Sequence, residues 1–263
     1  METQEILAEI KDSDMVLVGL GEDFDDALRP RGCPEYIRGR ELLQASGYHW
    51  LIPAWNEYCS AKMGGDIVSP VLEKLAGILG DKNYFVVATA TDSRVARGPW
   101  KKDRLVVPCG TVFRKQCIRG CGQEIEDVTE EERERMKASF EELFAGHLPE
   151  AGLEVLVRCG RCGASMELNN VFAENYNEQG YMERWQLYTK WLQGTLNRRL
   201  LVLELGVGMR FPSVVRWPFE KIVYLNNKAT FIRVNEKLYQ MTEELAGKGC
   251  GIEQNAIAWL ERL

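Results

Sequence analysis

Four of the eight cysteines fall into two closely spaced pairs, a pattern typical of a metal site. Three residues separate Cys117 from Cys121, two separate Cys159 from Cys162, and 37 lie between the pairs. The neighbouring glycines supply the backbone freedom that tight turns need: Gly120, Gly122, Gly160 and Gly163. Four thiolates satisfy tetrahedral zinc and leave no open coordination position, so the spacing predicts a structural zinc site. Unrelated core cysteines, or an iron–sulfur or redox role, are the alternatives.

Two glycine turns form the second pattern that could do chemistry. Gly19-Leu20-Gly21 and Gly206-Val207-Gly208 each end an apolar run that is typical of a strand. Such a turn lets a phosphate approach the backbone amides, and two of them at the ends of parallel strands would flank one crevice. The third glycine of the dinucleotide fingerprint is missing, because Glu22 and Asp23 follow the first turn. A plain strand-to-helix turn is therefore the alternative to a nucleotide site.

Only two histidines, His49 and His147, are available to a histidine-based mechanism in these 263 residues. His49 lies in an aromatic, helix-rich segment and His147 in a loop after a charged helix. We expect the first to be packed or on the surface and the second to be in the loop.

Charge and composition restrict the classes of partner. Lys and Arg total 33 against 39 Asp and Glu, a net charge of −6, and no basic run with interleaved aromatics surrounds the cysteines. This argues against an extended nucleic-acid surface, although not against a small anion site. No stretch approaches the ~18 uninterrupted apolar residues of a membrane span. Free thiols and an acidic, amphipathic N-terminus favour a cytoplasmic protein with no membrane partner.

The elements that must position these residues alternate along the chain. Short apolar runs are separated by helical patterns, which predicts a doubly wound parallel α/β sheet covered on both faces. The expected strands are 16–21, 84–90, 104–107, 199–208 and 229–235, and the expected helices include 3–11, 178–196 and 253–262.

Two regions interrupt this alternation. Residues 33–76 are aromatic and helix-like, and residues 112–172 hold the paired cysteines and a charged run. In that run an apolar stripe recurs at helical spacing: Met136, Phe140, Leu143 and Phe144. Its Glu/Arg face is expected to be solvated. We therefore expect one domain over 1–263, with the sheet lobe built from 1–32, 77–111 and 195–263, a helical insertion over 33–76 and a zinc-binding module over 112–172.

The order of these parts resembles the sirtuin family, most closely its divergent bacterial branch that includes the macrodomain-linked class M type. The resemblance is carried by a Thr-x-x-Asp strand end at Thr89–Asp92, the paired cysteines, LELGVGMRFPSVVRWPFEKI (203–222) and NNKATFIRVN (226–235). It is best from 84 to 235 and loose over the first 75 residues.

The resemblance implies a Rossmann-like lobe that binds NAD or ADP-ribose, a small lobe with structural Zn²⁺, and a cleft between them. Carried over by position, Gly19 and Gly21 would lie near the pyrophosphate. Thr89 and Asp92 would border the nicotinamide pocket, and Cys117, Cys121, Cys159 and Cys162 would hold zinc. Three residues would surround the adenosine half: Gly206, Val207 and Asn235.

The sequence departs from the family at central positions. The usual Asn-x-Asp reads Ala90-Thr91-Asp92, and the usual catalytic His-Gly reads Cys109-Gly110. A thiol has a reference pKa near 8.5, so Cys109 would act as base or nucleophile only beside a cation such as Arg114. As a small half-buried residue it could also have no function.

In the sirtuin family an Asp-Phe-Arg loop covers the nicotinamide. This loop is not recognisable in the present sequence, although Arg29 or Arg31 could replace its arginine.

Two functions follow from the resemblance. The first is a sirtuin-like, NAD-dependent protein-modifying transferase with a degenerate site, performing ADP-ribosyl transfer or deacylation with Asp92 and Cys109 as catalytic candidates. Its partner would be a protein acceptor, with an acylated or lipoylated lysine as one form. The alternatives are an inactive NAD or ADP-ribose sensor or scaffold, or a zinc-stabilised interaction module that binds no nucleotide.

Overall fold

A six-stranded parallel sheet forms the centre of the larger lobe, in the order β3-β2-β1-β7-β8-β9. We analysed a computed structural model that describes residues 3–122, 124–147 and 152–263. The strands are β1 (Met15–Leu20), β2 (Asn83–Ala88), β3 (Leu105–Val106), β7 (Leu200–Leu205), β8 (Ala229–Val234) and β9 (Gly249–Ile252). Successive strands extend outward from β1 on one side and from β7 on the other. The strand order therefore reverses between β1 and β7, as in open sheets that bind ligands at their carboxyl ends.

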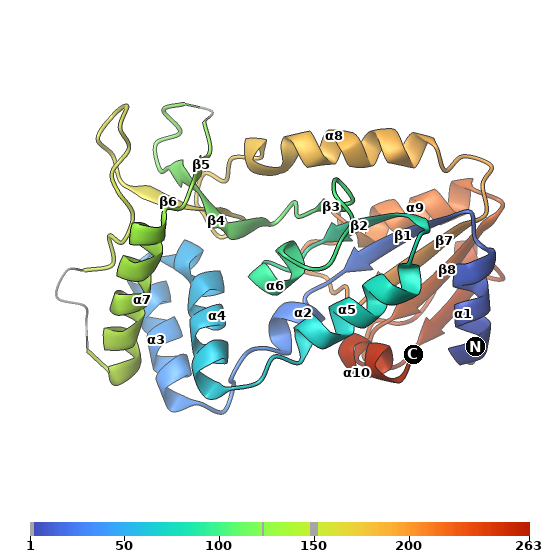
Figure 1. The fold of residues 1–263 in the computed structure, drawn as a ribbon, viewed down its shortest axis with the longest axis horizontal. Helices are drawn as coiled ribbons and strands as arrows, with labels where there is room; N and C mark the ends of the chain where they lie inside the picture. The colour runs from blue at the N-terminus through green and yellow to red at the C-terminus, as the bar shows by residue number, and fades with distance from the viewer. Residues whose placement is uncertain (1–2, 123, 148–151) are drawn as a thin grey trace.

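Helices cover both faces of this sheet (Figure 1). One face packs on α1 (Thr3–Asp12), α5 (Val68–Leu79), α10 (Ala256–Arg262) and the short α2 (Asp23–Asp26) and α6 (Ser93–Ala96). The other packs on α8 (Gln179–Gln193) and α9 (Arg216–Leu225). Alternate residues of β1 enter the two cores, with Val16 and Val18 on one face and Leu17 on the other. This alternation explains why the strands read as continuous apolar runs, and it confirms the predicted doubly wound α/β core.

A second lobe joins two segments that are separate in the sequence (Figure 1). Its antiparallel sheet has the order β5-β4-β6, formed by β4 (Gly110–Cys117), β5 (Glu126–Asp127) and β6 (Met166–Asn170). The helices are α3 (Pro34–Ala45), α4 (Ile52–Met63) and α7 (Glu130–Ala145), with the 3₁₀ turn η1 (His49–Leu51). Trp55 of α4 meets Phe140 of α7 edge to face, with ring centroids 5.4 Å apart. The helical insertion and the cysteine-bearing module therefore share one apolar core.

Helix α7 confirms the predicted helical stripe. Thr129 and Glu132 form a capping box at its N-terminus, and Met136, Phe140 and Leu143 are buried. The expected solvation of its charged face is wrong at one position. Glu132 is fully buried, accepts a hydrogen bond from Lys115 at 2.7 Å and one from the backbone N–H of Val157 at 2.9 Å. One carboxylate of the charged run thus ties α7 to β4.

Other differences between the expectations and the structure concern the boundaries of segments and elements. The 33–76 range cuts through α5, whose apolar side chains lie in the core of the larger lobe. Helix α8, which the expected ranges left between lobes, covers the sheet through Tyr188 and Trp191. Strand β9 was not expected, because its GCGI sequence has two glycines and no apolar run. The remaining short element is η2 (Glu243–Leu245). Within the described parts of the chain, no helix combines the length and apolarity needed to cross a bilayer.

Candidate metal and nucleotide sites

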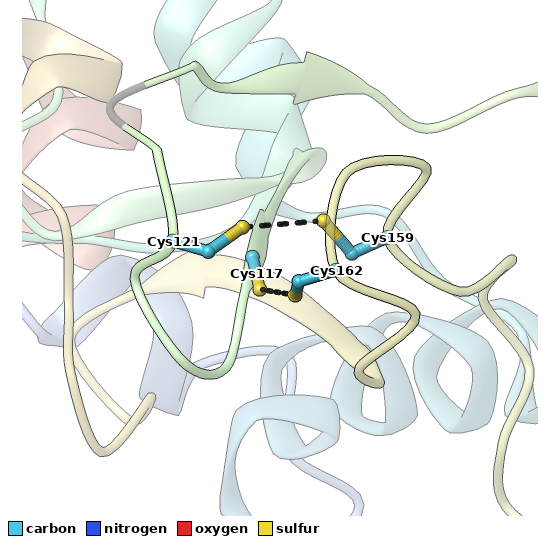
Figure 2. A group of neighbouring side chains, drawn as sticks. All are labelled: Cys117, Cys121, Cys159 and Cys162. Atoms are coloured by element: carbon cyan, nitrogen blue, oxygen red, sulfur yellow. Dashed lines mark hydrogen bonds between the residues drawn. The ribbon is translucent and has the colours of Figure 1, made fainter.

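The four predicted cysteines converge in the second lobe (Figure 2). All four Sγ atoms lie within 4.8 Å of one another. The Sγ atoms of Cys117 and Cys162 are 3.5 Å apart, as are those of Cys121 and Cys159. Four zinc–sulfur bonds of about 2.3 Å at tetrahedral angles would separate the sulfurs by about 3.8 Å. The donor set and its spacing therefore fit a closed, four-coordinate metal site.

The electrostatics of this cluster also favour a cation. At Cys117 burial raises the thiol pKa, but backbone N–H groups of Cys121 and Arg119 outweigh it and bring the pKa to about 7. Backbone N–H groups of Cys162 and Arg161 lower the pKa of Cys159. The other three sulfurs raise the pKa of Cys121 to about 12, which a metal ion would reverse. When bound, zinc would cross-link β4 and β6 through their adjoining turns.

A crevice lies at the sheet's reversal point, beside the carboxyl ends of β1, β7 and β8. Its volume is about 610 Å³, and Gly206, Gly208 and Asn235 line it. Four acidic side chains, Glu22, Asp23, Asp26 and Glu236, share the lining with Arg31 and Lys237. The structure thus places two of the expected adenosine residues at one hollow.

The positions in the two turns require glycine for different structural reasons. A Cβ on Gly19 would lie 2.6 Å from Val215 and 2.9 Å from Phe219, so this glycine lets the start of α9 pack on β1. A Cβ on Gly21 would lie 2.1 Å from the carbonyl oxygen of Gly206, because the two turns touch backbone to backbone. Gly206 itself has φ of 64°, a conformation that favours glycine. Close packing therefore accounts for Gly19, which does not line the crevice.

The backbone amides of these turns are engaged within the chain. Gly21 donates to Leu205 O at 2.9 Å, and Gly206 donates to Val234 O at 2.8 Å. Gly208 donates to Glu22 Oε2 at 2.7 Å. Glu22 is 7% exposed, and its other oxygen has no hydrogen-bond partner. A buried unpaired carboxylate oxygen at the crevice is an acceptor that a ligand hydroxyl or a water can satisfy.

Asn235, which lines the crevice, organises the loop that follows β8. The Asn235 amide donates to Val207 O at 3.2 Å, and its Oδ1 accepts the N–H groups of Lys237 and Leu238 at 2.9 and 2.8 Å. Val207, the third residue expected around the adenosine half, is 1% exposed and does not line the crevice. Beneath them, the fully buried Glu204 bonds Arg233 at 2.6 Å. This ion pair fixes the ends of β7 and β8 relative to each other.

Asp25, on α2, organises the loop that follows β2. Its carboxylate accepts the N–H of Thr91 at 2.9 Å, the Thr91 hydroxyl at 3.2 Å and the N–H of Asp92 at 3.0 Å. Burial raises the pKa of Asp25 to about 6, and the Asp92 charge adds to this, while the Thr91 N–H opposes it. Thr89 continues the pairing of β2 with β1 through its N–H to Leu20 O at 2.8 Å. The loop from Thr89 to Asp92 is thus attached to the segment after the first glycine turn.

Asp92 already has local partners. Its side chain caps α6 by accepting the Arg94 N–H at 2.8 Å, and it forms an ion pair with the Arg94 guanidinium at 2.9 Å. Burial raises its pKa although Arg94 lowers it. The Ser93 N–H and hydroxyl bond Glu57 of α4 at 2.8 and 2.7 Å. Burial, followed by the Asp92 charge, raises the pKa of Glu57 to about 8.

Cys109 is fully buried beside this acidic group. Burial raises the pKa of its thiol far above the usual range, and the charges of Asp25 and Glu22 raise it further, against an opposing effect of Arg210. The thiol is therefore protonated at neutral pH. The cation expected beside it, Arg114, instead pairs with Asp127 at 3.1 Å. This environment is the opposite of the one that activates a cysteine.

The two histidines lie in the second lobe, whereas the two arginines that follow the first glycine turn both pair with Asp26. His49 and His147 are both exposed in the second lobe. The Arg29 side chain is 9% exposed, pairs with Asp26 at 2.7 Å and keeps an unpartnered Nε. Arg31 is 67% exposed and pairs with the same aspartate at 2.7 Å. Arg29 is the buried member of the pair, with Asp25 and Arg210 among its charged neighbours.

Sequence reasoning missed Glu22 and Asp25 as residues of this site. Their available signal was their position within four residues of Gly21, at the N-cap and in the single turn of α2. Both were passed over because carboxylates do not fit a phosphate-binding fingerprint.

The whole architecture matches solved structures. A Sir2 structure with a p53 peptide and NAD⁺ superimposes with a TM-score of 0.54 at 16% identity, covering 100% of this chain and 97% of that one. A Sir2 structure bound to a propionylated peptide gives a TM-score of 0.55 at 16% identity, with the same coverage. This chain has the sirtuin fold.

Sequence comparison adds relatives to this sirtuin-like chain. A protein ADP-ribosyltransferase of Staphylococcus aureus strain Mu50 is 22% identical over 262 residues, covering 90% of this chain and 78% of that protein. A probable bifunctional ADP-ribose hydrolase/ADP-ribosyltransferase of Fusarium oxysporum f. sp. cubense is 27% identical over 161 residues. That match spans 58% of this chain and 26% of the fungal protein. No protein-family model matches the sirtuin-like chain.

Proposed function

We propose that this chain is an NAD-dependent, sirtuin-like protein-modifying enzyme that performs ADP-ribosyl transfer or deacylation. The observation that carries the proposal is the crevice at the reversal point of a sirtuin fold, where Glu22 Oε1 is buried and unpartnered. The nearby Arg29 Nε is also buried and unpartnered. An acceptor and a donor without partners in one region suit a polar ligand that carries hydroxyl and phosphate groups.

The position of each residue suggests its role in the proposed reaction. Gly206 and Asn235 border the nucleotide crevice, and the buried Arg29 pairs with Asp26 of its lining. In ADP-ribosyl transfer the bond from the ribose C1′ to the nicotinamide nitrogen breaks, and nicotinamide leaves with the electron pair. A nucleophilic atom of the acceptor then bonds to C1′ and loses a proton. Asp25, the buried carboxylate that holds the Thr91–Asp92 loop, would favour positive charge on a ribose bound beside that loop.

Asp92 is proposed to orient the nicotinamide amide or to polarise the acceptor. Its loop is held by Asp25 on one side and by Glu57 through Ser93 on the other. Cys109 enters this scheme as a neutral thiol that fills space, because its pKa is raised by burial. Chemistry that needs a base at that position is not supported, and this favours ADP-ribosyl transfer over classical deacetylation.

A second function, a non-catalytic NAD or ADP-ribose sensor, is favoured by one observation. The carboxylate of Asp92 is paired with Arg94, and the amides of both glycine turns are already bonded. A site in this state could bind a nucleotide without cleaving it.

One experiment distinguishes the two functions. The purified chain is incubated with NAD, with and without an acylated or lipoylated peptide, while nicotinamide release and NAD-induced thermal stabilisation are measured. Release with stabilisation supports the enzyme, stabilisation without release supports the sensor, and neither signal contradicts both. Asp92→Asn should abolish release. Asp66→Asn is the matched control, because Asp66 is a more exposed partner of Arg94, at 3.4 Å, outside the loop.

A further inference from the structure

A second large hollow lies at the opposite end of the sheet, away from the nucleotide crevice. Its volume is about 730 Å³, and it is bounded by Met15 and Asn83 at the starts of β1 and β2. The other wall is the last half of α8, which contributes Leu187 and Trp191. No residue that lines this hollow also lines the crevice among those described. The proposed NAD-dependent function therefore leaves this hollow without a role.

Four cations surround the hollow: Lys102, Arg104, Lys190 and Arg198. They come from the loop before β3, from α8 and from the turn after α8. Within the described residues, none of the four forms an ion pair with a carboxylate within 4 Å. A chain with a net charge of −6 thus gathers four unpaired positive side chains from three segments around one concavity.

The two acidic residues of the hollow are neutralised by arginines outside its lining. Asp14 pairs with Arg199 at 3.1 Å and also accepts the Arg199 backbone N–H at 3.0 Å. Asp103 pairs with Arg184 of α8. These contacts engage both carboxylates, although the Arg198 charge also acts on Asp14, after the larger effect of Arg199. The lining therefore carries an excess of positive charge, and a concave surface with one dominant sign of charge concentrates counter-ions.

We propose that this hollow binds a small polyanion of the polyphosphate class. Its four cations are spread over three segments, so a ligand with several linked anionic groups can contact more of them than a single phosphate can. The Leu187–Trp191 wall is apolar and can pack against a carbon skeleton that carries the phosphates. Binding would connect the amino-terminal edge of the sheet to α8 without involving the nucleotide crevice.

The test is titration of the full chain with inorganic tripolyphosphate, measured by isothermal titration calorimetry at low salt. We expect one site, with affinity falling from tripolyphosphate to pyrophosphate to phosphate, and binding unchanged by saturating ADP-ribose. Lys190→Gln combined with Arg198→Gln should weaken binding about tenfold, which corresponds to about 1.4 kcal/mol, because two of the four cations are removed. Lys62→Gln with Lys137→Gln, which removes the same charge from the second lobe, should leave the affinity unchanged.

The proposal would be overturned by the absence of a heat of binding, by equal weakening in both double variants, or by displacement by ADP-ribose. A hexaglutamate peptide distinguishes a polyphosphate site from a docking site for an acidic protein segment, and tighter binding of the peptide would also overturn it. Arg104→Gln alone provides a second variant if the double variant has a lowered melting temperature.

Discussion

The four-cysteine site and the crevice at the ends of β1, β7 and β8 differ in how their residues were brought together. In the cysteine site, two short-spaced pairs on tight turns bring four sulfurs within 4.8 Å of one another. In the crevice, Glu22, Gly206 and Asn235 come from segments up to 213 residues apart and meet only because β1, β7 and β8 are neighbours. Short-range spacing specified the chemistry of the first site, whereas sheet order selected the neighbours that define the second.

The largest expected effect is loss of the metal. Replacing Cys159 with Ser should leave three sulfurs and abolish binding of the zinc ion expected to join the two turns. Structural zinc contributes an apparent ~10–16 kcal/mol in zinc-finger peptides, so the second lobe should lose its folded state. Elemental analysis should give one zinc per wild-type chain and none for the variant, with a lower melting temperature by circular dichroism. Cys250→Ser, outside the cluster, should keep the zinc, and a zinc-free wild type with unchanged melting would contradict the assignment.

A large effect is also expected where the two turns touch at the crevice. Gly21→Ala places a Cβ 2.1 Å from the carbonyl oxygen of Gly206, and backbone cannot yield as a flexible side chain can. Overpacking of this kind typically costs about 1–3 kcal/mol. Urea unfolding should show this loss, and NAD-induced stabilisation should fall with it. Gly32→Ala is the control, because its Cβ would meet nothing within 4 Å, and equal stability of both variants would contradict the tight contact.

A smaller, pH-dependent effect is expected at the junction between the lobes, where Glu57 bonds Ser93. Its folded-state pKa is raised from 4.5 to about 8, chiefly by burial, so the folded protein favours the protonated acid. The associated stability is complete below pH 4.5 and is lost as the pH rises toward 8. The pKa values of Asp23 and Asp25 are also raised, both to about 6, so these two groups change the stability at lower pH than Glu57 does.

Urea midpoints between pH 6 and 8 test this directly. The wild type should lose stability over this range, and Glu57→Gln should flatten the slope. Glu73→Gln, which removes an exposed carboxylate on α5, should keep the wild-type slope. A slope unchanged by Glu57→Gln would show that other groups cause the pH dependence.

The smallest effect is expected at Cys109. Because its thiol is buried and protonated, Cys109→Ala should leave nicotinamide release per folded molecule unchanged, with only a modest loss of stability from the missing sulfur. Release assays normalised to the folded fraction provide the measurement. A loss of release as large as that of Asp92→Asn would restore Cys109 to the mechanism.

Much of the fold followed from pattern. Burial on both faces of a sheet gives continuous apolar runs, and burial on one face of a helix gives apolar residues at helical spacing. These patterns made it possible to predict the strands at 84–90 and 229–235 and the apolar stripe of 136–144. Strand β9 shows no such apolar pattern, because two of its four residues are glycine. The sharing of one core by α4 and α7 was equally hidden, since it joins segments about 80 residues apart.

The sequence by itself determined the alternating α/β architecture and the four cysteines that fit a metal site, since periodicity and the spacing of cysteines are local properties. Only the tertiary structure decided the chemistry around Cys109. It placed Asp25 and Glu22 near the thiol and paired Asp92 with Arg94, whereas the expected Arg114 pairs elsewhere. The physical reason is that protonation depends on burial and on charges within a few ångströms, and both are set by contacts between distant segments.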